Sequence, residues 1–194
     1  MSGTEPYLFF CGIKHSGKST MSAFMSKETG LACFDTDDII LASFPGIHTI
    51  RSVYHLLGKE SFMEKEAAAL SSLADFKPTV TWKGYRGVVS LGGGACDNAP
   101  VMDFVTAHGT LVYLAVPEDI LFRRISIGGI PPFLDAEHPR ESFHQLYSLR
   151  NQLYGKHARL VIRLPDCHGR ADTFRYLFEQ LSDYVDAQSM PEKQ

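Results

Sequence analysis

The stretch Gly12-Ile-Lys-His-Ser-Gly-Lys-Ser19 constrains this chain more than any other part of it. It matches the pattern G-x-x-x-x-G-K-[ST], in which backbone N–H groups of a glycine-containing loop form a nest for phosphate oxygens. An apolar run at 7–11 precedes it, and residues 19–27 after it read as an amphipathic helix. A strand, a glycine loop and a helix, in this order, are the setting that a phosphate-binding loop needs. The alternative is a glycine-rich turn in front of an ordinary helix.

Each position of this loop has a physical role in nucleotide binding. Gly12 and Gly17 allow backbone angles that a side chain would forbid. Lys18 supplies a mobile charge for the outer phosphates, and Ser19 offers a hydroxyl group to Mg²⁺. The helix that begins near Lys18 adds the positive end of its dipole. We therefore expect ATP and Mg²⁺ as cofactors, with ATP bound by Gly12, His15, Ser16, Gly17, Lys18, Ser19 and Thr20.

Composition limits the class of protein. The chain has 194 residues, a formal net charge of -3 and no long basic run, which predicts one domain over 1–194 and argues against a nucleic-acid partner. No apolar stretch approaches the roughly 18 residues of a membrane span, and no secretory signal is visible at the N-terminus. Cys11 and Cys33 lie in apolar runs, which indicates free thiols in a reducing compartment. We expect a cytoplasmic monomer that acts on a small-molecule substrate.

Apolar runs alternate with helical patterns along the whole chain. This alternation predicts an α/β fold, a three-layer sandwich around a five-stranded parallel sheet with right-handed crossovers. Ligands of such sheets bind outside the carboxyl ends of the strands. The expected strands are 7–11, 31–34, 86–91, 110–116 and 159–164, and the expected helices are 19–27, 49–57, 59–76, 99–107, 118–125, 139–154 and 173–185. Gly30 is expected to stop the first helix, Thr49 to cap the second and Gly58 to separate the second from the third, while 188–194 are expected to fray.

Two features follow the ends of expected strands and so belong to the same edge of the sheet. Asp35 and Asp37 come after the second strand, where they either share one side of an extended segment or begin a helix. The two interpretations are compatible, and one carboxylate could hold Mg²⁺ while the other accepts a proton from a hydroxyl group. Gly92–Gly94 follow the third strand, where they serve either a sharp turn or a close approach of the backbone.

Two charged residues lie on apolar faces of expected helices. Glu66 needs a partner if it is buried, and otherwise it sits at a solvated edge of its face. A buried Arg150 needs an anion, which could be Glu66, another acid or an anionic ligand. Residues 127–134 combine glycines with prolines and read as a mobile lid, about 126–138, or as an inert surface loop. With the phosphate loop, this set predicts phosphoryl transfer to a metabolite, with Lys18 at the phosphates and at least one of the two aspartates taking part in the chemistry.

From residue 7 to about 165 the sequence resembles shikimate kinase, a family with the nucleoside-monophosphate-kinase-like fold. The resemblance rests on several short motifs that occur in the family's order. They are Gly17-Lys-Ser-Thr20, Phe34-Asp-Thr-Asp-Asp-Ile39, Ile50-x-x-Val-Tyr-x-x-x-Gly58-x-x-x-Phe62-x-x-x-Glu66, Leu91-Gly-Gly-Gly-Ala95, Pro132-Phe-Leu134 and Arg150-x-x-Leu-Tyr154.

The resemblance implies a role for each matching position and an acceptor site that includes helices at about 36–76. It implies phosphorylation of shikimate to shikimate 3-phosphate in aromatic amino-acid biosynthesis. On the donor side, Lys18 binds the outer phosphates, Ser19 ligates Mg²⁺ with support from Asp35, and Arg124 packs on the adenine. On the acceptor side, Asp37 holds the hydroxyl groups and takes the proton, Gly92, Gly93 and Gly94 present backbone N–H groups, and Arg150 binds the carboxylate.

The sequence departs from the family pattern at three positions. Met63 stands where the family has an arginine that clamps the acceptor, and Pro131 stands where a lid arginine reaches the nucleotide. His15 replaces a usual glycine, and Lys14, Arg51, Lys59, Lys83 or Arg123 could supply the missing charge. Two alternatives to a shikimate kinase therefore remain. One is a regulatory nucleotide-binding protein without catalysis, and the other is a kinase of another metabolite such as gluconate or a nucleotide.

Overall fold

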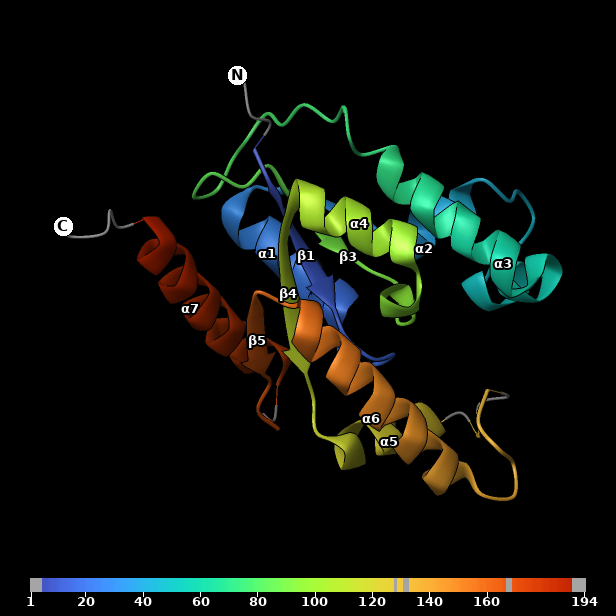
Figure 1. Cartoon of the computed structure of the whole chain (residues 1–194). Coiled ribbons are helices and arrows are strands. Elements are labelled where there is room, and N and C mark those ends of the chain that lie inside the picture. Colours follow the sequence, from blue (N-terminus) through green and yellow to red (C-terminus); the bar gives the residue numbers. More distant parts are fainter. Residues whose placement is uncertain (1–4, 128, 131–132, 167–168, 190–194) are drawn as a thin grey trace.

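The computed structural model describes residues 5–127, 129–130, 133–166 and 169–189, and its centre is a parallel β-sheet (Figure 1). The five strands lie in the order β2-β3-β1-β4-β5, so β1 occupies the middle and the chain crosses over it once, between β3 and β4. All four pairings are parallel, which confirms the predicted sheet. The strands are β1 (Tyr7–Cys11), β2 (Ala32–Asp35), β3 (Gly87–Ser90), β4 (Gly109–Ala115) and β5 (Leu160–Arg163).

Helices cover both faces of the sheet and complete the three layers. Their bounds are α1 (Lys18–Thr29), α2 (Thr36–Ala42), α3 (Ile50–Ser71), α4 (Ala99–His108), α5 (Glu118–Ser126), α6 (Pro139–His157) and α7 (Arg170–Ser189), with a short 3-10 helix η1 (Ala95–Asp97). Residues of α1 and α7 join one apolar core, and residues of α3 and α4 join the other. Figure 1 shows the phosphate-loop helix α1 beginning at the same edge of the sheet where β3 leads into α4.

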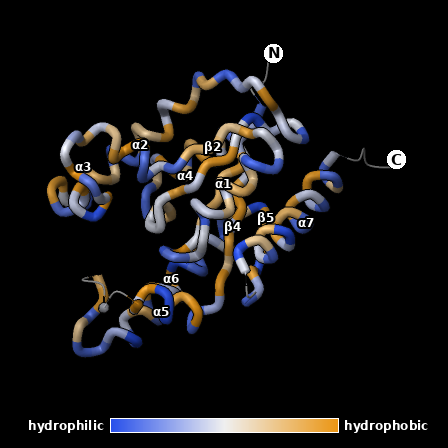
Figure 2. Tube along the Cα trace, turned by 180° about the vertical axis from the view of Figure 1, so that it is seen from behind, coloured by the Kyte–Doolittle hydropathy of each residue, from blue (hydrophilic) through white to orange (hydrophobic). Residues whose placement is uncertain are grey.

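Strand β1 separates the two cores by its own alternation. Leu8 and Phe10 point into the core shared with α1 and α7, while Tyr7, Phe9 and Cys11 point into the core on the opposite face. All five residues are fully buried, as expected for a central parallel strand covered on both sides. In Figure 2 the neighbouring strand β4 is likewise coloured as hydrophobic, while the surrounding helices are of mixed character.

Local sequence signals set the ends of several helices. Gly30 ends α1 with a φ of 77°, a left-handed conformation that favours glycine. The side chain of Thr49 caps α3 by accepting a hydrogen bond from the backbone N–H of Ser52. Gly58 interrupts α3 with a φ of 75° and a ψ of 176°, so the two helices predicted on either side of it meet at a break. These three predictions are confirmed.

Other expectations need correction. The helix predicted over 59–76 ends at Ser71, because the backbone beyond it continues in tighter turns whose N–H groups bond three residues back. Helix α7 extends to Ser189, so fraying from residue 188 is wrong for its first two residues, and 190–194 lie outside the described range. Cys33 is exposed because β2 lies at the edge of the sheet, whereas Cys11 is buried as expected.

Within the described residues, no helix is both long enough and apolar enough to cross a bilayer.

Candidate active site

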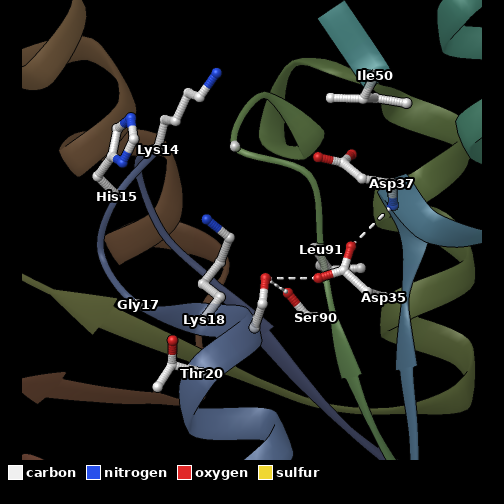
Figure 3. A pocket seen from close by; sticks show the side chains of 12 residues that line it. Lys14, His15, Gly17, Lys18, Thr20, Asp35, Asp37, Ile50, Ser90 and Leu91 are labelled. Carbon is white, nitrogen blue, oxygen red and sulfur yellow. Dashed lines mark hydrogen bonds between the residues drawn. The ribbon is translucent and has the colours of Figure 1, made fainter. Parts of the chain in front are cut away.

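A cavity of about 280 Å³ lies at the carboxyl ends of β1, β2 and β3 (Figure 3). Its position agrees with the expected ligand edge of a parallel sheet. It brings together the phosphate loop and both aspartates that the sequence marked. Its lining residues are Lys14, His15, Gly17, Lys18, Ser19, Thr20, Asp35, Asp37, Ile50, Ser90, Leu91 and Gly93.

The phosphate loop is held open by left-handed backbone at Gly12, His15 and Gly17, whose φ angles are 153°, 67° and 94°. A Cβ atom at Gly12 would lie 2.7 Å from Ser16 Oγ and 2.9 Å from the carbonyl oxygen of Leu114. Gly12 is therefore required by space as well as by angle. His15 adopts a conformation that costs a residue with a side chain on the order of 1 kcal/mol, which explains the usual glycine at this position.

Lys18 is held inside the loop by backbone oxygens. Its Nζ donates to the carbonyl oxygens of Gly12, at 2.9 Å, and Ile13, at 3.4 Å. Burial lowers the pKa of Lys18 to about 8, although nearby acidic groups, including Asp37 and Asp35, oppose the shift. The ammonium group has therefore lost its water without gaining an acid partner among the described residues. A phosphate oxygen in the loop would provide that partner.

Two further observations show that the loop fits a polyphosphate. The buried hydroxyl group of Ser16 has no hydrogen-bond partner, and a buried polar atom of this kind is costly unless a ligand satisfies it. Arg124 Nη1 donates to the carbonyl oxygen of His15 at 3.2 Å, so α5 supports the tip of the loop. Arg124 thus lies beside the loop.

A hydroxyl group and a carboxylate meet at the position expected for Mg²⁺. Ser19 Oγ donates to Asp35 Oδ2 at 2.6 Å, and Ser90 Oγ lies 3.3 Å from the same Ser19 atom. Asp35 also caps α2, because its Oδ1 accepts the backbone N–H of Asp37 at 3.0 Å. Hard oxygen ligands of this type suit Mg²⁺, which keeps several waters or phosphate oxygens in its shell. The oxygen atoms of Ser19 and Asp35 are thus of the kind that holds Mg²⁺ beside a phosphate-binding loop.

Asp37 stands in the first turn of α2 and directs its carboxylate into the cavity (Figure 3). Helix capping by Asp35 means that the two aspartates do not share an extended segment, so that alternative is wrong. Burial raises the pKa of Asp37, the negative charge of Asp35 raises it further, and Lys18 opposes both. A raised pKa makes a carboxylate a stronger proton acceptor. Asp37 is thus suited to take a proton from an acceptor hydroxyl group.

Gly92–Gly94 allow three parts of the protein to approach one loop. A Cβ atom added to Gly92 would lie 2.7 Å from Glu66 Oε1, and one added to Gly93 would lie 3.1 Å from the backbone nitrogen of Lys14. A Cβ atom added to Gly94 would lie 3.2 Å from Arg150 Nη2. None of these glycines has a positive φ, so close approach rather than a left-handed turn explains them. The N–H of Gly92 donates to Thr36 Oγ1 at 2.9 Å. It is engaged within the protein and is not free for the acceptor, contrary to expectation.

Glu66 is buried with a partner, so the solvated alternative is wrong. Only 5% of the residue is exposed, and Asn98 Nδ2 donates to its Oε2 at 3.2 Å. The same amide group donates to the carbonyl oxygen of Met63 at 2.8 Å and so ties α3 to the start of α4. Burial raises the pKa of Glu66, an effect that the hydrogen bond from Asn98 partly offsets.

Arg150 is paired with an acid that the sequence did not single out. Its Nη2 lies 3.2 Å from Asp97 Oδ2, with the two side chains 20% and 36% exposed. Asp97 belongs to η1, immediately after the three glycines. The next turn of α6 adds Tyr154, whose hydroxyl group donates to the carbonyl oxygen of Gly93 at 3.2 Å. Of the predicted alternatives for Arg150, an acid other than Glu66 is the one present.

Sequence reasoning missed several residues of this site. Ser90 is the last residue of β3, and its place at a strand end is a signal that could have identified it. Asp97 and Asn98 offered no comparable signal, because their partners lie on other helices. The predicted lid at 126–138 is described only in part, since 128 and 131–132, including Pro131, lie outside the described residues. Of its described part, Ile127, Ile130 and Phe133 are exposed and Leu134 is buried.

Comparison with known proteins adds independent findings. The family model described as shikimate kinase matches residues 14–181. A shikimate kinase of Psychrobacter sp. (strain PRwf-1) is 28% identical over 170 residues, covering 88% of this chain and 89% of the relative. One of Neisseria gonorrhoeae (strain ATCC 700825 / FA 1090) is 26% identical over 175 residues, covering 90% and 95%.

Solved structures show the same fold. A shikimate kinase from Acinetobacter baumannii in complex with shikimate superposes with a TM-score of 0.78 at 24% identity, covering 97% of each chain. A gluconokinase from Sinorhizobium meliloti 1021 gives a TM-score of 0.56 at 13% identity, covering 96% of this chain and 99% of its own.

Proposed function

Because the chain belongs to the shikimate kinase family, a family of ATP-dependent small-molecule kinases, we propose that it phosphorylates a hydroxyl group of a small hydroxy acid. Shikimate is the first candidate, with shikimate 3-phosphate as the product, and this reaction would place the protein in aromatic amino-acid biosynthesis. The observation that carries the proposal is a single cavity lined by the phosphate loop, by the Ser19–Asp35 pair and by the carboxylate of Asp37.

The donor half of the site positions the nucleotide. When ATP enters, Lys18 exchanges its backbone carbonyl partners for phosphate oxygens, and the loop N–H groups together with Ser16 Oγ satisfy the others. Bound Mg²⁺ neutralises negative charge on the phosphates, and Ser19 and Asp35 are the residues that would hold it. Phosphoryl transfer needs little more from the protein than position and charge.

The acceptor half orients the hydroxyl group that reacts. Asp37 hydrogen-bonds this hydroxyl group and accepts its proton as the new phosphate bond forms. Arg150 binds the acid group of the acceptor, which takes the place of Asp97 as the partner of the guanidinium. Helices α2 and α3 provide the surrounding wall, and the described part of 126–138 lies in the segment that we propose as the lid.

The test is an ADP-release assay with MgATP across shikimate, quinate, gluconate and nucleoside monophosphates. We expect turnover with a hydroxy acid, confirmed by the mass of the phosphorylated product, and none with nucleoside monophosphates. The variant Lys18→Met controls for contaminating kinases. ATP binding without turnover on any acceptor would reject the proposal and favour the regulatory alternative.

A further inference from the structure

The acceptor wall of the cavity, formed by Asp37 of α2 and Ile50 of α3, includes no lysine or arginine of these helices among the described lining residues. Met63 stands where the family pattern has an arginine, and its backbone oxygen accepts a hydrogen bond from Asn98. The guanidinium of Arg150 is already paired with Asp97. Asp37 adds negative charge to the wall and Glu66 lies behind it at Gly92, so an acid acceptor needs a further cation.

Lys14 is the residue that the structure brings to this wall. It lies in the phosphate loop between Ile13 and His15 and lines the cavity together with Asp37 and Ile50. In Figure 3 its side chain extends away from the end of the loop that holds Lys18 and Thr20. The ammonium group thus lies in the same upper part of the view as Ile50, the first residue of α3.

Adjacent glycines connect Lys14 with Arg150. A Cβ atom added to Gly93 would lie 3.1 Å from the backbone nitrogen of Lys14 and 3.4 Å from the Lys14 Cβ. A Cβ atom added to Gly94 would lie 3.2 Å from Arg150 Nη2. Neighbouring residues of one loop thus contact the backbone and Cβ of Lys14, which lines the cavity, and the guanidinium of Arg150, which lies beside the lining without being part of it. A ligand acid group bound at this loop would be near both basic residues.

The charge of Lys14 is available to a ligand. Lys14 is exposed, and in the described part of the chain it forms no ion pair. Burial raises the pKa of Asp37, and the positive charge of Lys14 is close enough to oppose part of this rise. The other candidates are engaged or distant. Lys83 pairs with Asp186 at 2.5 Å and Arg123 with Asp166 at 3.6 Å, while Arg51 and Lys59 do not line the cavity.

We propose that Lys14 binds the acid group of the acceptor opposite Arg150 and is the residue that sets the preference for an anionic acceptor. The inference rests on the proposed function, because it assigns a role in the acceptor half of the same site. It also explains how a chain with Met63 can retain an acid-binding acceptor site. In this chain Lys14 of the phosphate loop supplies the positive charge that an arginine at the position of Met63 supplies in the family pattern.

The kinetic test compares Lys14→Met, Lys14→Arg and the control Lys27→Met, which removes an exposed lysine from the last turn of α1. Loss of one charged contact predicts a KM for shikimate raised about 10- to 100-fold in Lys14→Met. The kcat and the KM for ATP stay unchanged, Lys14→Arg restores most of the loss, and the control matches the original chain. The methyl ester of shikimate, which lacks the charge, has the same KM in all four proteins.

A rise in the KM for ATP alone, or equal losses for shikimate and its ester, overturns the proposal by assigning Lys14 to the phosphates or to packing. Calorimetric titration of shikimate into the ADP-bound protein separates this result from failure of the proposed function. If shikimate binds and Lys14→Met weakens it without any turnover in the original chain, the catalytic proposal fails and the role of Lys14 stands. If the original chain binds no shikimate, the role of Lys14 is overturned, whatever other acceptor it phosphorylates.

Discussion

The two halves of the cavity are built in different ways. The donor half is a single stretch of chain, Gly12 to Thr20, whose backbone groups face the ligand and whose conformation is set by its own glycines. The acceptor half is lined by Asp37 of α2 and Ile50 of α3, and its neighbours Glu66 and Arg150, which do not line the cavity, are held by partners far away in the sequence. Arg150 and Asp97 are 53 residues apart, and Glu66 and Asn98 are 32 apart.

Because of this difference, the nucleotide and the acceptor meet groups in different states when they bind. The donor half contains unsatisfied groups, namely the partnerless hydroxyl group of Ser16 and an ammonium group on Lys18 with only carbonyl neighbours. The acceptor half is internally satisfied, since Asp97 already occupies the guanidinium of Arg150. The nucleotide therefore fills a gap, whereas an acid acceptor must displace a partner. Four measurements, described from the largest expected effect to the smallest, test this contrast.

Lys18→Met should have the largest effect. Removing a charge that faces the transferred phosphate is expected to lower kcat/KM about 1,000-fold. The same change should leave the unfolding temperature equal or higher, because burial lowers the pKa of Lys18 to about 8 and the charged form therefore opposes folding at neutral pH. Activity assays and thermal unfolding measure the two effects. If the unfolding temperature falls together with the activity, Lys18 stabilises the fold, and the donor half does not contain the unsatisfied charge described above.

Asp37→Asn should lower kcat about 100-fold, because the amide cannot accept the hydroxyl proton. In the original chain, activity should fall as the pH drops through the pKa of Asp37, which burial raises above its ordinary value of 3.8. This acidic limb should disappear in the variant. Rate profiles against pH for both proteins, with ATP saturating, provide the measurement. An acidic limb that persists unchanged would remove Asp37 from the role of base.

Nucleotide affinity should depend on pH through Lys18. With a pKa of about 8, the ammonium group is charged below that pH and loses its proton as the pH rises through it. The Kd for ADP should be constant below pH 8 and rise by up to about tenfold per pH unit above it, because phosphate binds the charged form. Fluorescence or calorimetric titration of the original chain shows this, and Lys18→Met should give weak binding without the inflection.

Asp97→Asn should have the smallest effect and the opposite sign. It frees Arg150 from a pair that is partly exposed, and such pairs contribute about 1 kcal/mol, so the KM for an acid acceptor should fall about fivefold. The uncharged methyl ester should show no change. If the KM for the acid rises instead, Asp97 positions Arg150 for binding and does not compete with the ligand.

The same contrast decides how much the sequence could predict. The sheet, the phosphate loop and the ends at Gly30, Thr49 and Gly58 depend on local patterns, and these predictions are confirmed. The position of Asp35 at the end of an expected strand favoured a helix start, and the residue does cap α2; its role toward Mg²⁺ was implied by the resemblance and stays a prediction. Local chemistry is readable where a residue and its partner lie close together in the chain.

The partners of the acceptor residues could not be predicted, because packing between helices determines them. A buried arginine on an apolar face required an anion, yet nothing in the sequence distinguished Asp97 from other acids. Likewise, a buried Glu66 required a donor, and Asn98 satisfies it only because α3 and α4 pack together. The free N–H expected at Gly92 was also wrong, since its partner Thr36 approaches from another strand's end.

The loop after β3 connects the phosphate loop with the residues proposed for the acceptor. It lies against Lys14 at Gly93, Glu66 at Gly92 and Arg150 at Gly94, with no side chain of its own to absorb a displacement. A shift of the phosphate loop on nucleotide binding would therefore change the surroundings of a bound acceptor. Thermodynamic linkage then requires reciprocity: the factor by which nucleotide alters the affinity for the acceptor equals the factor by which the acceptor alters the affinity for nucleotide.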